Sequence, residues 1–202
     1  MKLLIGSNNK HKADEIQEIF DRVALGKVKI LTPSNVLSDV LDIIEDGDTL
    51  EKNALLKAQG FFEATGISCI ADDTGLEIDA LNGKPGVRSA RFAGEDSNDQ
   101  NNRDKVLYLM KDIEPQRRSA RFRTVICYYG SDDVWYVDGI CEGQIINSEL
   151  GSNGFGYDPI FIPEGFDLTF AEMTAEQKNK LSHRGKAIEN LISELFIRKL
   201  IY

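Results

Sequence analysis

The sequence contains few cysteines: three among 202 residues, at positions 69, 127 and 141. They lie far apart, their number is odd and no CxxC spacing occurs. This usage argues against a disulfide framework and against a structural zinc site. Two of the three stand in apolar, strand-like runs, so we expect them to be small buried hydrophobic residues. Such usage favours a reducing, cytoplasmic location.

Long hydrophobic runs and dense basic runs are missing as well. No stretch approaches the roughly 18 consecutive apolar residues that span a membrane. The apolar run 1–6 is too short for a signal peptide and is expected to form a first strand. The formal net charge is −9, and without a basic face the chain is not expected to bind nucleic acid. A small anionic ligand would need a local basic cluster or a metal ion.

Hydrophobic periodicity predicts a chain that alternates between strands and helices. The order begins β-α-β-α-β and continues with antiparallel-looking strands, which indicates an α/β (mixed α+β) fold with a mixed sheet. The predicted strands are residues 2–6, 28–31, 67–71, 76–81, 120–128, 134–137 and 144–146. The predicted helices begin after Lys12, at an Asp48/Glu51 capping box, near Val106, at a Thr174/Gln177 capping box and at Ser182. The first two are expected to end at Gly26 and Gly66.

An acidic pair follows the buried strand 67–71. Asp72 and Asp73 are neighbours in a strand-to-loop element that continues as Thr74-Gly75. Two adjacent ionised carboxylates repel each other unless a cation compensates them, and Mg²⁺ prefers such oxygen ligands. The alternative is an Asx-turn, in which the aspartates cap backbone amides. The adjacent spacing excludes the Asp-x-Asp-x-Thr motif of haloacid-dehalogenase-type phosphatases.

Two helix starts carry the wrong charge for their dipoles. Residues 7–12, Ser-Asn-Asn-Lys-His-Lys, enter the first helix, and residues 182–186, Ser-His-Arg-Gly-Lys, open the last one, with Lys178 and Lys180 just upstream. An anion bound at such an N-terminus would reverse the penalty, so the pattern favours a polyanionic ligand. The alternative is a solvated loop with ordinary caps. No GxxxxGK[ST] sequence occurs, so neither is a Walker loop.

Two further features have both a functional and a structural interpretation. Asn53 and Lys57 lie four residues apart on one helix face. A buried Lys57 would pair with the acidic pair or with a phosphate, and the alternative is an exposed lysine. In the loop 151–159, glycines allow a close backbone approach to a ligand, and Phe155 and Tyr157 are able to stack on a base. The alternative is a long turn that packs its aromatic residues into the core.

Taken together, these residues resemble the inosine triphosphate pyrophosphatase family, which hydrolyses non-standard purine nucleotides. The resemblance covers residues 4–195 and rests on six blocks in order. The blocks are Ser7-x-Asn9-x-x-Lys12, Asn53-Ala54-x-x-Lys57-Ala58, Ala71-Asp72-Asp73-Thr74-Gly75-Leu76, Pro85-Gly86 with Ser89-Ala90-Arg91, Gly154-Phe155-Gly156-Tyr157-Asp158-Pro159, and Ser182-His183-Arg184-Gly185.

The resemblance implies one nucleotide pyrophosphatase domain over residues 1–202, with an elongated mixed sheet flanked by helices and a nucleotide cleft between two lobes. It also implies a homodimer and Mg²⁺ as cofactor. Asp73, Lys57 and Lys12 are the implied catalytic residues, and Glu45, Asp73 and Asp72 the implied metal ligands. The implied substrate-binding residues are Ser7, Asn8, Asn9, Lys10, His11, Lys12, Thr74, Phe155, Gly156, Tyr157, Asp158, Lys178, His183 and Arg184.

The implied reaction is hydrolysis of ITP, dITP and XTP to a nucleoside monophosphate and pyrophosphate. Two positions depart from the family pattern. Thr74 replaces a more common serine and keeps its hydroxyl, whereas Lys52 stands where a glutamate often precedes the asparagine. Two alternatives remain: a pyrophosphatase of other modified nucleoside triphosphates, and a nucleotide-binding protein without turnover.

Overall fold

The computed structural model describes residues 1–7, 10–23 and 27–202, and it leaves the side chains of residues 10–12 and 15 undescribed. The chain forms two compact units, each built from segments far apart in the sequence. The first unit comprises residues 1–73, 124–139 and 184–202, and the second comprises 74–123 and 140–183. The single domain expected over residues 1–202 stays a prediction.

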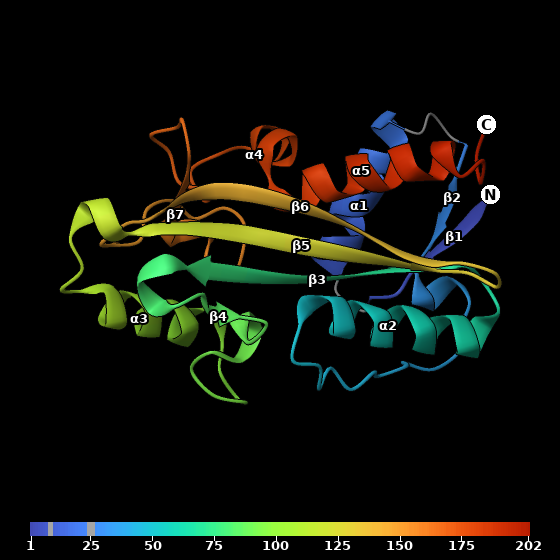
Figure 1. Cartoon of the computed structure of the whole chain (residues 1–202), viewed down its shortest axis with the longest axis horizontal. Helices are drawn as coiled ribbons and strands as arrows, with labels where there is room; N and C mark the ends of the chain where they lie inside the picture. Colours follow the sequence, from blue (N-terminus) through green and yellow to red (C-terminus); the bar gives the residue numbers. More distant parts are fainter. Residues whose placement is uncertain (8–9, 24–26) are drawn as a thin grey trace. The chain divides into compact units, whose positions relative to one another are not determined.

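The strands form one mixed sheet in the order β2-β1-β3-β5-β6-β7, with β4 paired to β3 (Figure 1). β1 is parallel to β2 and β3, whereas β4 is antiparallel to β3 and β7 to β6. The predicted mixed α/β fold is confirmed. The strands are β1 Lys2–Ile5, β2 Lys29–Leu31, β3 Cys69–Ile78, β4 Lys84–Gly86, β5 Ser119–Tyr129, β6 Val134–Ile145 and β7 Phe161–Pro163.

Five helices accompany the sheet in the described part of the chain. They are α1 Lys10–Val23, α2 Leu50–Thr65, α3 Asp99–Met110, α4 Ala175–Leu181 and α5 His183–Ile197. The predicted capping box at Thr174 and Gln177 is confirmed, as is the stop at Gly66, which takes the left-handed conformation. None of these helices has the length and apolar character needed to cross a bilayer.

One predicted helix start was wrong by one residue. Thr49, not Asp48, caps α2, because its extended backbone lets its hydroxyl accept the Lys52 N–H. Ser182 has an extended backbone and directly precedes His183, the first residue of α5, so it occupies the predicted cap position of the last helix. The predicted stop of the first helix, Gly26, lies outside the described residues.

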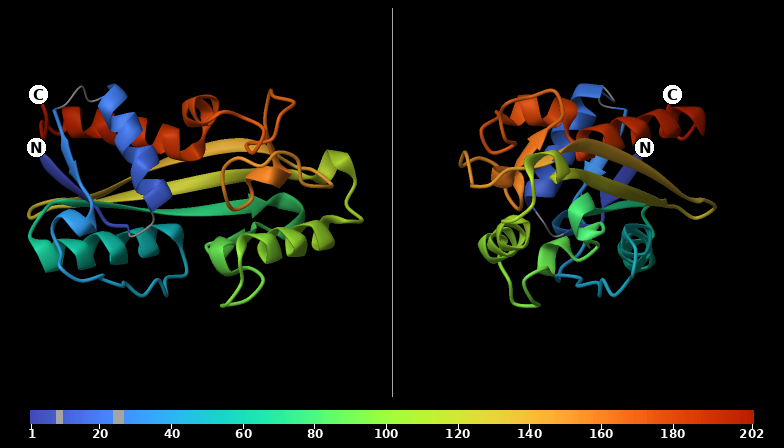
Figure 2. Two further views of the ribbon diagram at one scale, coloured as in Figure 1. Left: turned by 180° about the vertical axis from the view of Figure 1, so that it is seen from behind. Right: turned by 60° about the vertical axis from the view of Figure 1, so that its left-hand side comes forward.

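In the first unit, the alternation of side chains along β1 separates two hydrophobic cores. Leu3 and Ile5 pack with the apolar stripes of α1 and α5, whereas Leu4 packs with Phe61 of α2. Within this unit, α1 and α5 therefore cover one face of the strands and α2 the other (Figures 1 and 2). The cysteines are free and buried, as expected.

In the second unit, α3 lies on one side of the strands and α4 on the other (Figure 2). Its core joins Val106 and Met110 of α3 to Phe122 of β5, Phe161 of β7 and the buried Phe170. Residues 83–98, between the predicted strand 76–81 and the predicted helix near Val106, contain the short strand β4 and a 3₁₀ turn at residues 89–91.

Two strand predictions were wrong in extent. β3 runs without interruption through Asp72-Asp73-Thr74-Gly75, so the predicted loop and the Asx-turn alternative are both excluded there. β6 is one strand that joins the predicted segments 134–137 and 144–146. Glycines at positions 75, 139 and 143 weaken the strand signal, whereas pairing with neighbouring strands supplies the backbone hydrogen bonds that continue each strand.

Arg118, directly before β5, is a buried arginine that donates only to backbone carbonyls. Its guanidinium reaches the carbonyl oxygens of Met110, Ile113, Ile145 and Ile146 at 2.7–3.2 Å, and the residue is 3% exposed. It joins the end of α3 to the end of β6 within the second unit.

We expect Arg118→Met to lower the free energy of unfolding by about 3 kcal/mol, because buried carbonyls then lose their donors. Urea unfolding measures this change. The exposed neighbour Arg117 provides the control, since Arg117→Met should change stability by less than about 0.5 kcal/mol. Equal effects of the two substitutions would contradict the assigned role of Arg118.

Candidate active site

The acidic pair lies within β3, and the two side chains point to opposite faces of the strand. Asp72 faces α5, where its Oδ2 lies 3.5 Å from Nε of Arg184. Asp73 faces α2, where it accepts a hydrogen bond from Nδ2 of Asn53 at 3.1 Å. Both aspartates are buried. Each carboxylate therefore has its own partner, and the repulsion expected between neighbouring carboxylates is reduced.

Lys57 of α2 is a buried ammonium held by two carboxylates. Its Nζ lies 2.6 Å from Oε2 of Glu45 and 3.8 Å from Oδ1 of Asp73, and the residue is 8% exposed. The exposed-lysine alternative is thus excluded. Burial lowers the pKa of Lys57, but attraction by Asp73, Asp72 and Glu45 outweighs it, so the pKa lies above its ordinary value of 10.5. Lys57 is therefore a cation at neutral pH.

Asn53 links this acidic face to the segment that carries Glu45. Its Oδ1 accepts the backbone N–H of Gly47 at 2.8 Å, while its Nδ2 donates to Asp73. A Cβ atom at Gly47 would lie 2.5 Å from the same Oδ1, so only glycine fits this approach. Asn53, Lys57, Glu45 and Asp73 together are called the lysine–carboxylate cluster below.

Arg184 and Asp72 form a buried ion pair on the other face. Their side chains are 3% and 1% exposed. Arg184 lies in the first turn of α5, one of the helix starts whose basic charge predicts an anionic ligand. In the structure, the anion that it faces within the first unit is Asp72. Buried pairs of this kind set geometry more than they add stability.

In the second unit, the loop after β6 is organised around the carboxylate of Asp158. Oδ2 of Asp158 accepts the backbone N–H of Phe155 at 2.9 Å and Nζ of Lys178 at 2.7 Å. Gly154 has φ +74° and a Cβ there would clash with this carboxylate, so glycine is required. Asp158 and Lys178 are both buried.

The two aromatic residues of this loop have different surroundings. Tyr157 belongs to the core of the second unit, and its hydroxyl donates to the carbonyl of Ser89 at 2.7 Å. The core-packing alternative therefore describes Tyr157. Phe155 is only half-buried, and Nζ of Lys178 lies 4.7 Å from its ring centroid, a cation–π contact. Of the two, Phe155 keeps the surface that stacking on a base requires.

His183 is a buried imidazole placed by aromatic rings. It stacks on Phe122 with ring centroids 4.6 Å apart and planes inclined by 18°, and Phe170 lies 6.3 Å away. Sequence reasoning missed Phe122, which alternates with arginines in a predicted strand, and Phe170, which lies in no predicted element or motif. The alternation predicts that Phe122 is buried, but not which ring it contacts.

The remaining predicted site residues are described only in part. Ser7 follows β1, and Thr74 is a half-buried residue of β3. Asn8 and Asn9 lie outside the described residues, as do the side chains of Lys10, His11 and Lys12. The boundary between the two units falls between Asp73 and Thr74 and again between His183 and Arg184.

A metal site made by the protein alone is not found among the residues that the structure describes, where no three His, Cys, Asp or Glu side chains converge. Glu45 and Asp73 nevertheless reach the same ammonium nitrogen, that of Lys57. Mg²⁺ usually takes one or two carboxylates and completes its shell with water and substrate phosphates. The two hard oxygen donors fit that mode of binding.

Relatives named for an enzymatic activity match nearly the whole chain. The chain is 46% identical to the dITP/XTP pyrophosphatase of Flavobacterium johnsoniae over 98% of this chain and 100% of that protein. It is 45% identical to the enzyme of the same name from Porphyromonas gingivalis, over 98% of this chain and 99% of that protein.

Solved structures agree with the fold. The Ham1 protein of Staphylococcus aureus has a TM-score of 0.85 and 38% identity, covering 98% of this chain and 100% of that one. The HAM1 protein of Coxiella burnetii has a TM-score of 0.87 and 36% identity, covering 97% of this chain and 98% of that one. Residues 3–194 match the Ham1 family. The resemblance inferred from the six sequence blocks is therefore confirmed, and the chain belongs to the Ham1 family.

Proposed function

We propose that this chain hydrolyses non-standard purine nucleoside triphosphates, namely dITP, XTP and ITP, to the monophosphate and pyrophosphate with Mg²⁺. The observation that carries the proposal is the lysine–carboxylate cluster, in which a buried, protonated Lys57 stands between Glu45 and Asp73. Relatives named dITP/XTP pyrophosphatase, similar over nearly their full length, support the substrate class.

Glu45 and Asp73 would hold the metal ion. When bound, Mg²⁺ supplies positive charge to the phosphate oxygens, on which negative charge builds during phosphoryl transfer. Lys57 adds a second positive charge that does not depend on the metal. Asp72, the third predicted ligand, points to the opposite face of β3 from Asp73 and lies 3.5 Å from Arg184, so its proposed role is to orient that arginine.

Asp73 is the proposed proton acceptor for the attacking water. One of its oxygens accepts from Asn53 and the other lies 3.8 Å from Lys57, so the carboxylate is oriented by one hydrogen bond and one ion pair. A water molecule hydrogen-bonded to it would attack the α-phosphorus, and pyrophosphate would leave. Ser7, Asn8, Asn9, Lys10, His11 and Lys12 are the proposed contacts of the phosphate chain, with Lys12 among the catalytic residues.

Base recognition is proposed for the group around Asp158. Phe155 would stack on the purine, while Gly156, Tyr157, Asp158, Lys178 and His183 complete the group. Thr74 and Arg184 are proposed as further substrate contacts. A donor that faces the purine 6-position favours a keto oxygen over the amino group of adenine. Leaving such a buried donor unpaired costs about 1–3 kcal/mol, roughly 5- to 150-fold in discrimination.

A homodimer in the cytoplasm is part of the proposal. Hydrolysis of other modified nucleoside triphosphates is the second candidate, because the same cluster would serve any triphosphate. A binding protein without turnover is the third. A pyrophosphate-release assay distinguishes both candidates from the main proposal.

We expect pyrophosphate release from dITP, XTP and ITP to exceed release from ATP and GTP by at least about tenfold in kcat/KM. The measurement is a coupled pyrophosphate assay with Mg²⁺, extended to methylated nucleotides. Equal rates on all purine nucleotides would contradict the substrate class, and release of orthophosphate alone would contradict the reaction. EDTA should abolish turnover, and added Mg²⁺ should restore it.

We expect Asp73→Asn to lower kcat by about 10²–10⁴-fold, because an amide cannot accept the proton of the attacking water. Nucleotide binding, followed by calorimetry, should remain measurable. Asp133→Asn, at an exposed turn of the same unit, is the matched control and should keep full activity. An active Asp73→Asn enzyme would remove Asp73 from the mechanism.

We expect Lys57→Met to lower the free energy of unfolding by about 2 kcal/mol at pH 7, because Glu45 and Asp73 then lose their cation. Mg²⁺ should recover part of this loss. The pKa of Lys57 in the folded protein is raised above 10.5. The contribution of Lys57 to the free energy of unfolding is therefore fully present below pH 10.5, and it is lost as the pH rises through the pKa of the folded protein.

The measurement is urea unfolding of the wild type and of Lys57→Met between pH 7 and pH 11. The difference between their free energies of unfolding should shrink only at the alkaline end of this range. Lys52→Met is the control, since the Lys52 side chain is 55% exposed and its Nζ lies 3.9 Å from Asp48. Such exposed pairs contribute less than about 1 kcal/mol. An equal loss in both variants would argue against a special environment for Lys57.

A further inference from the structure

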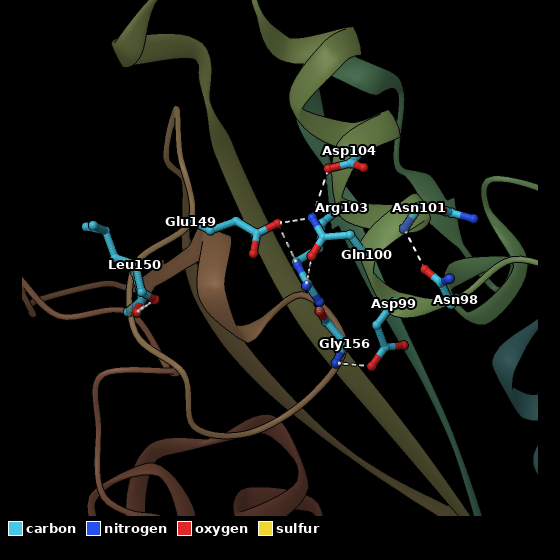
Figure 3. Close-up of polar contacts among 10 residues, drawn as sticks. Asn98, Asp99, Gln100, Asn101, Arg103, Asp104, Glu149, Leu150 and Gly156 are labelled. Atoms are coloured by element: carbon cyan, nitrogen blue, oxygen red, sulfur yellow. Dashed lines mark hydrogen bonds and ion pairs between the residues drawn. The ribbon is translucent and has the colours of Figure 1, made fainter.

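The two peptide units that flank Gly156, in the loop around Asp158, are both held by α3. The backbone N–H of Gly156 donates to Oδ2 of Asp99 at 2.8 Å, and its carbonyl accepts from Nη1 of Arg103 at 2.8 Å (Figure 3). Asp99 and Arg103 lie four residues apart, on one face of the first turns of α3. Both contacts are charge-assisted, which makes them stronger than neutral hydrogen bonds.

Arg103 is itself fixed in place. Its Nε lies 2.9 Å from Oε1 of Glu149, and its Nη2 donates to Oε1 of Gln100 at 2.7 Å (Figure 3). Gln100 in turn donates to Glu149 at 2.6 Å. All three nitrogens of the guanidinium are thus engaged, and its side chain is only 12% exposed. A planar group held at three atoms has a defined position.

The helix that makes these contacts is also anchored by residues outside the loop. Asn98 caps α3 by accepting the N–H of Asn101 at 2.9 Å. Val106 and Met110 bury its apolar side in the core of the second unit. α3 is therefore a rigid support from which Asp99 and Arg103 reach the loop.

The loop needs such a support. Gly154 and Gly156 both take positive φ, +74° and +61°, and glycine has the widest backbone freedom of any residue. The backbone of Gly156, held by α3, lies directly between Phe155 and Tyr157. Its orientation, together with the contact of the Phe155 N–H with Asp158, determines where the Phe155 ring points.

We propose that Asp99 and Arg103 are positioning residues for base recognition, with Gln100 and Glu149 orienting Arg103. They would hold the backbone of Gly156 in place so that the ring of Phe155 faces the purine. This proposal rests on the proposed function of the loop around Asp158. It adds residues that belong to none of the six sequence blocks.

Variants of Asp99 or Arg103 are therefore expected to show a higher KM and an unchanged kcat. Lys57 and Asp73, the groups assigned to the chemical step, belong to the first unit, whereas every contact of Asp99 and Arg103 given above lies within the second. Loss of the contacts from α3 should therefore weaken binding of the base equally in the bound substrate and in the transition state. The chemical step should stay intact. General destabilisation would instead lower the fraction of active protein and hence the apparent kcat.

The test compares Arg103→Gln and Asp99→Ala with Arg117→Gln and Asp112→Ala, exposed control positions in the same unit that carry the same charge changes. We expect KM for dITP to rise about tenfold in the first two variants, the loss of one charge-assisted hydrogen bond, with kcat within about twofold. Asp99→Asn keeps an acceptor oxygen and should stay within about threefold of the wild type in KM. The controls should match the wild type.

Amide hydrogen exchange of residues 153–158, measured without nucleotide, provides a second readout. Exchange should become faster in Arg103→Gln and Asp99→Ala, and stay unchanged in Asp99→Asn and in both controls. Urea unfolding identifies any variant that fails to fold. If Arg103→Gln fails to fold, the comparison of Asp99→Asn with Asp99→Ala tests the proposal.

Unchanged exchange in Arg103→Gln and Asp99→Ala would overturn the proposal, and so would faster exchange with an unchanged KM. A fall in kcat at constant KM would also overturn it. Failure of the wild type to release pyrophosphate would overturn the proposed function instead. In that case the hydrogen-exchange rates would still show whether α3 holds the loop.

Discussion

The alternation of side chains along β3 is the constraint on which the acidic site depends. Asp72 and Asp73 are neighbours in the sequence, but a strand directs them to opposite faces. Asp72 meets Arg184 of α5, and Asp73 meets Lys57 and Asn53 of α2. A helical or turn conformation at this point would have brought the carboxylates together and left one face without its acid.

One buried lysine in each unit is paired with carboxylates, and such pairing orients groups more than it stabilises the fold. Lys57 is held by Glu45 and Asp73 in the first unit, and Lys178 by Asp158 in the second. The side-chain nitrogen of each lysine is therefore held in one position. Arg118 differs, because its partners are only carbonyls and its role is to join chain segments.

Local sequence rules were reliable where local forces dominate. The stop of α2 at Gly66 and the capping box at Thr174 depend on neighbours within four residues, and both predictions are confirmed. The rules failed at residues 72–75 and 138–143, where polar residues and glycines resemble loops. Pairing between strands distant in sequence keeps these residues extended, and that pairing leaves no local pattern.

The sequence by itself determined the mixed α/β class, the buried cysteines and the family, because composition, periodicity and six ordered motifs are local properties. It also placed Asn53 and Lys57 on one helix face. Only the tertiary structure decided that Lys57 is buried between Glu45 and Asp73, and that Phe122 stacks on His183. It alone brought Asp99 and Arg103 onto Gly156, 57 and 53 residues further along the chain. Such contacts follow from the packing of distant segments, which no spacing along the chain encodes.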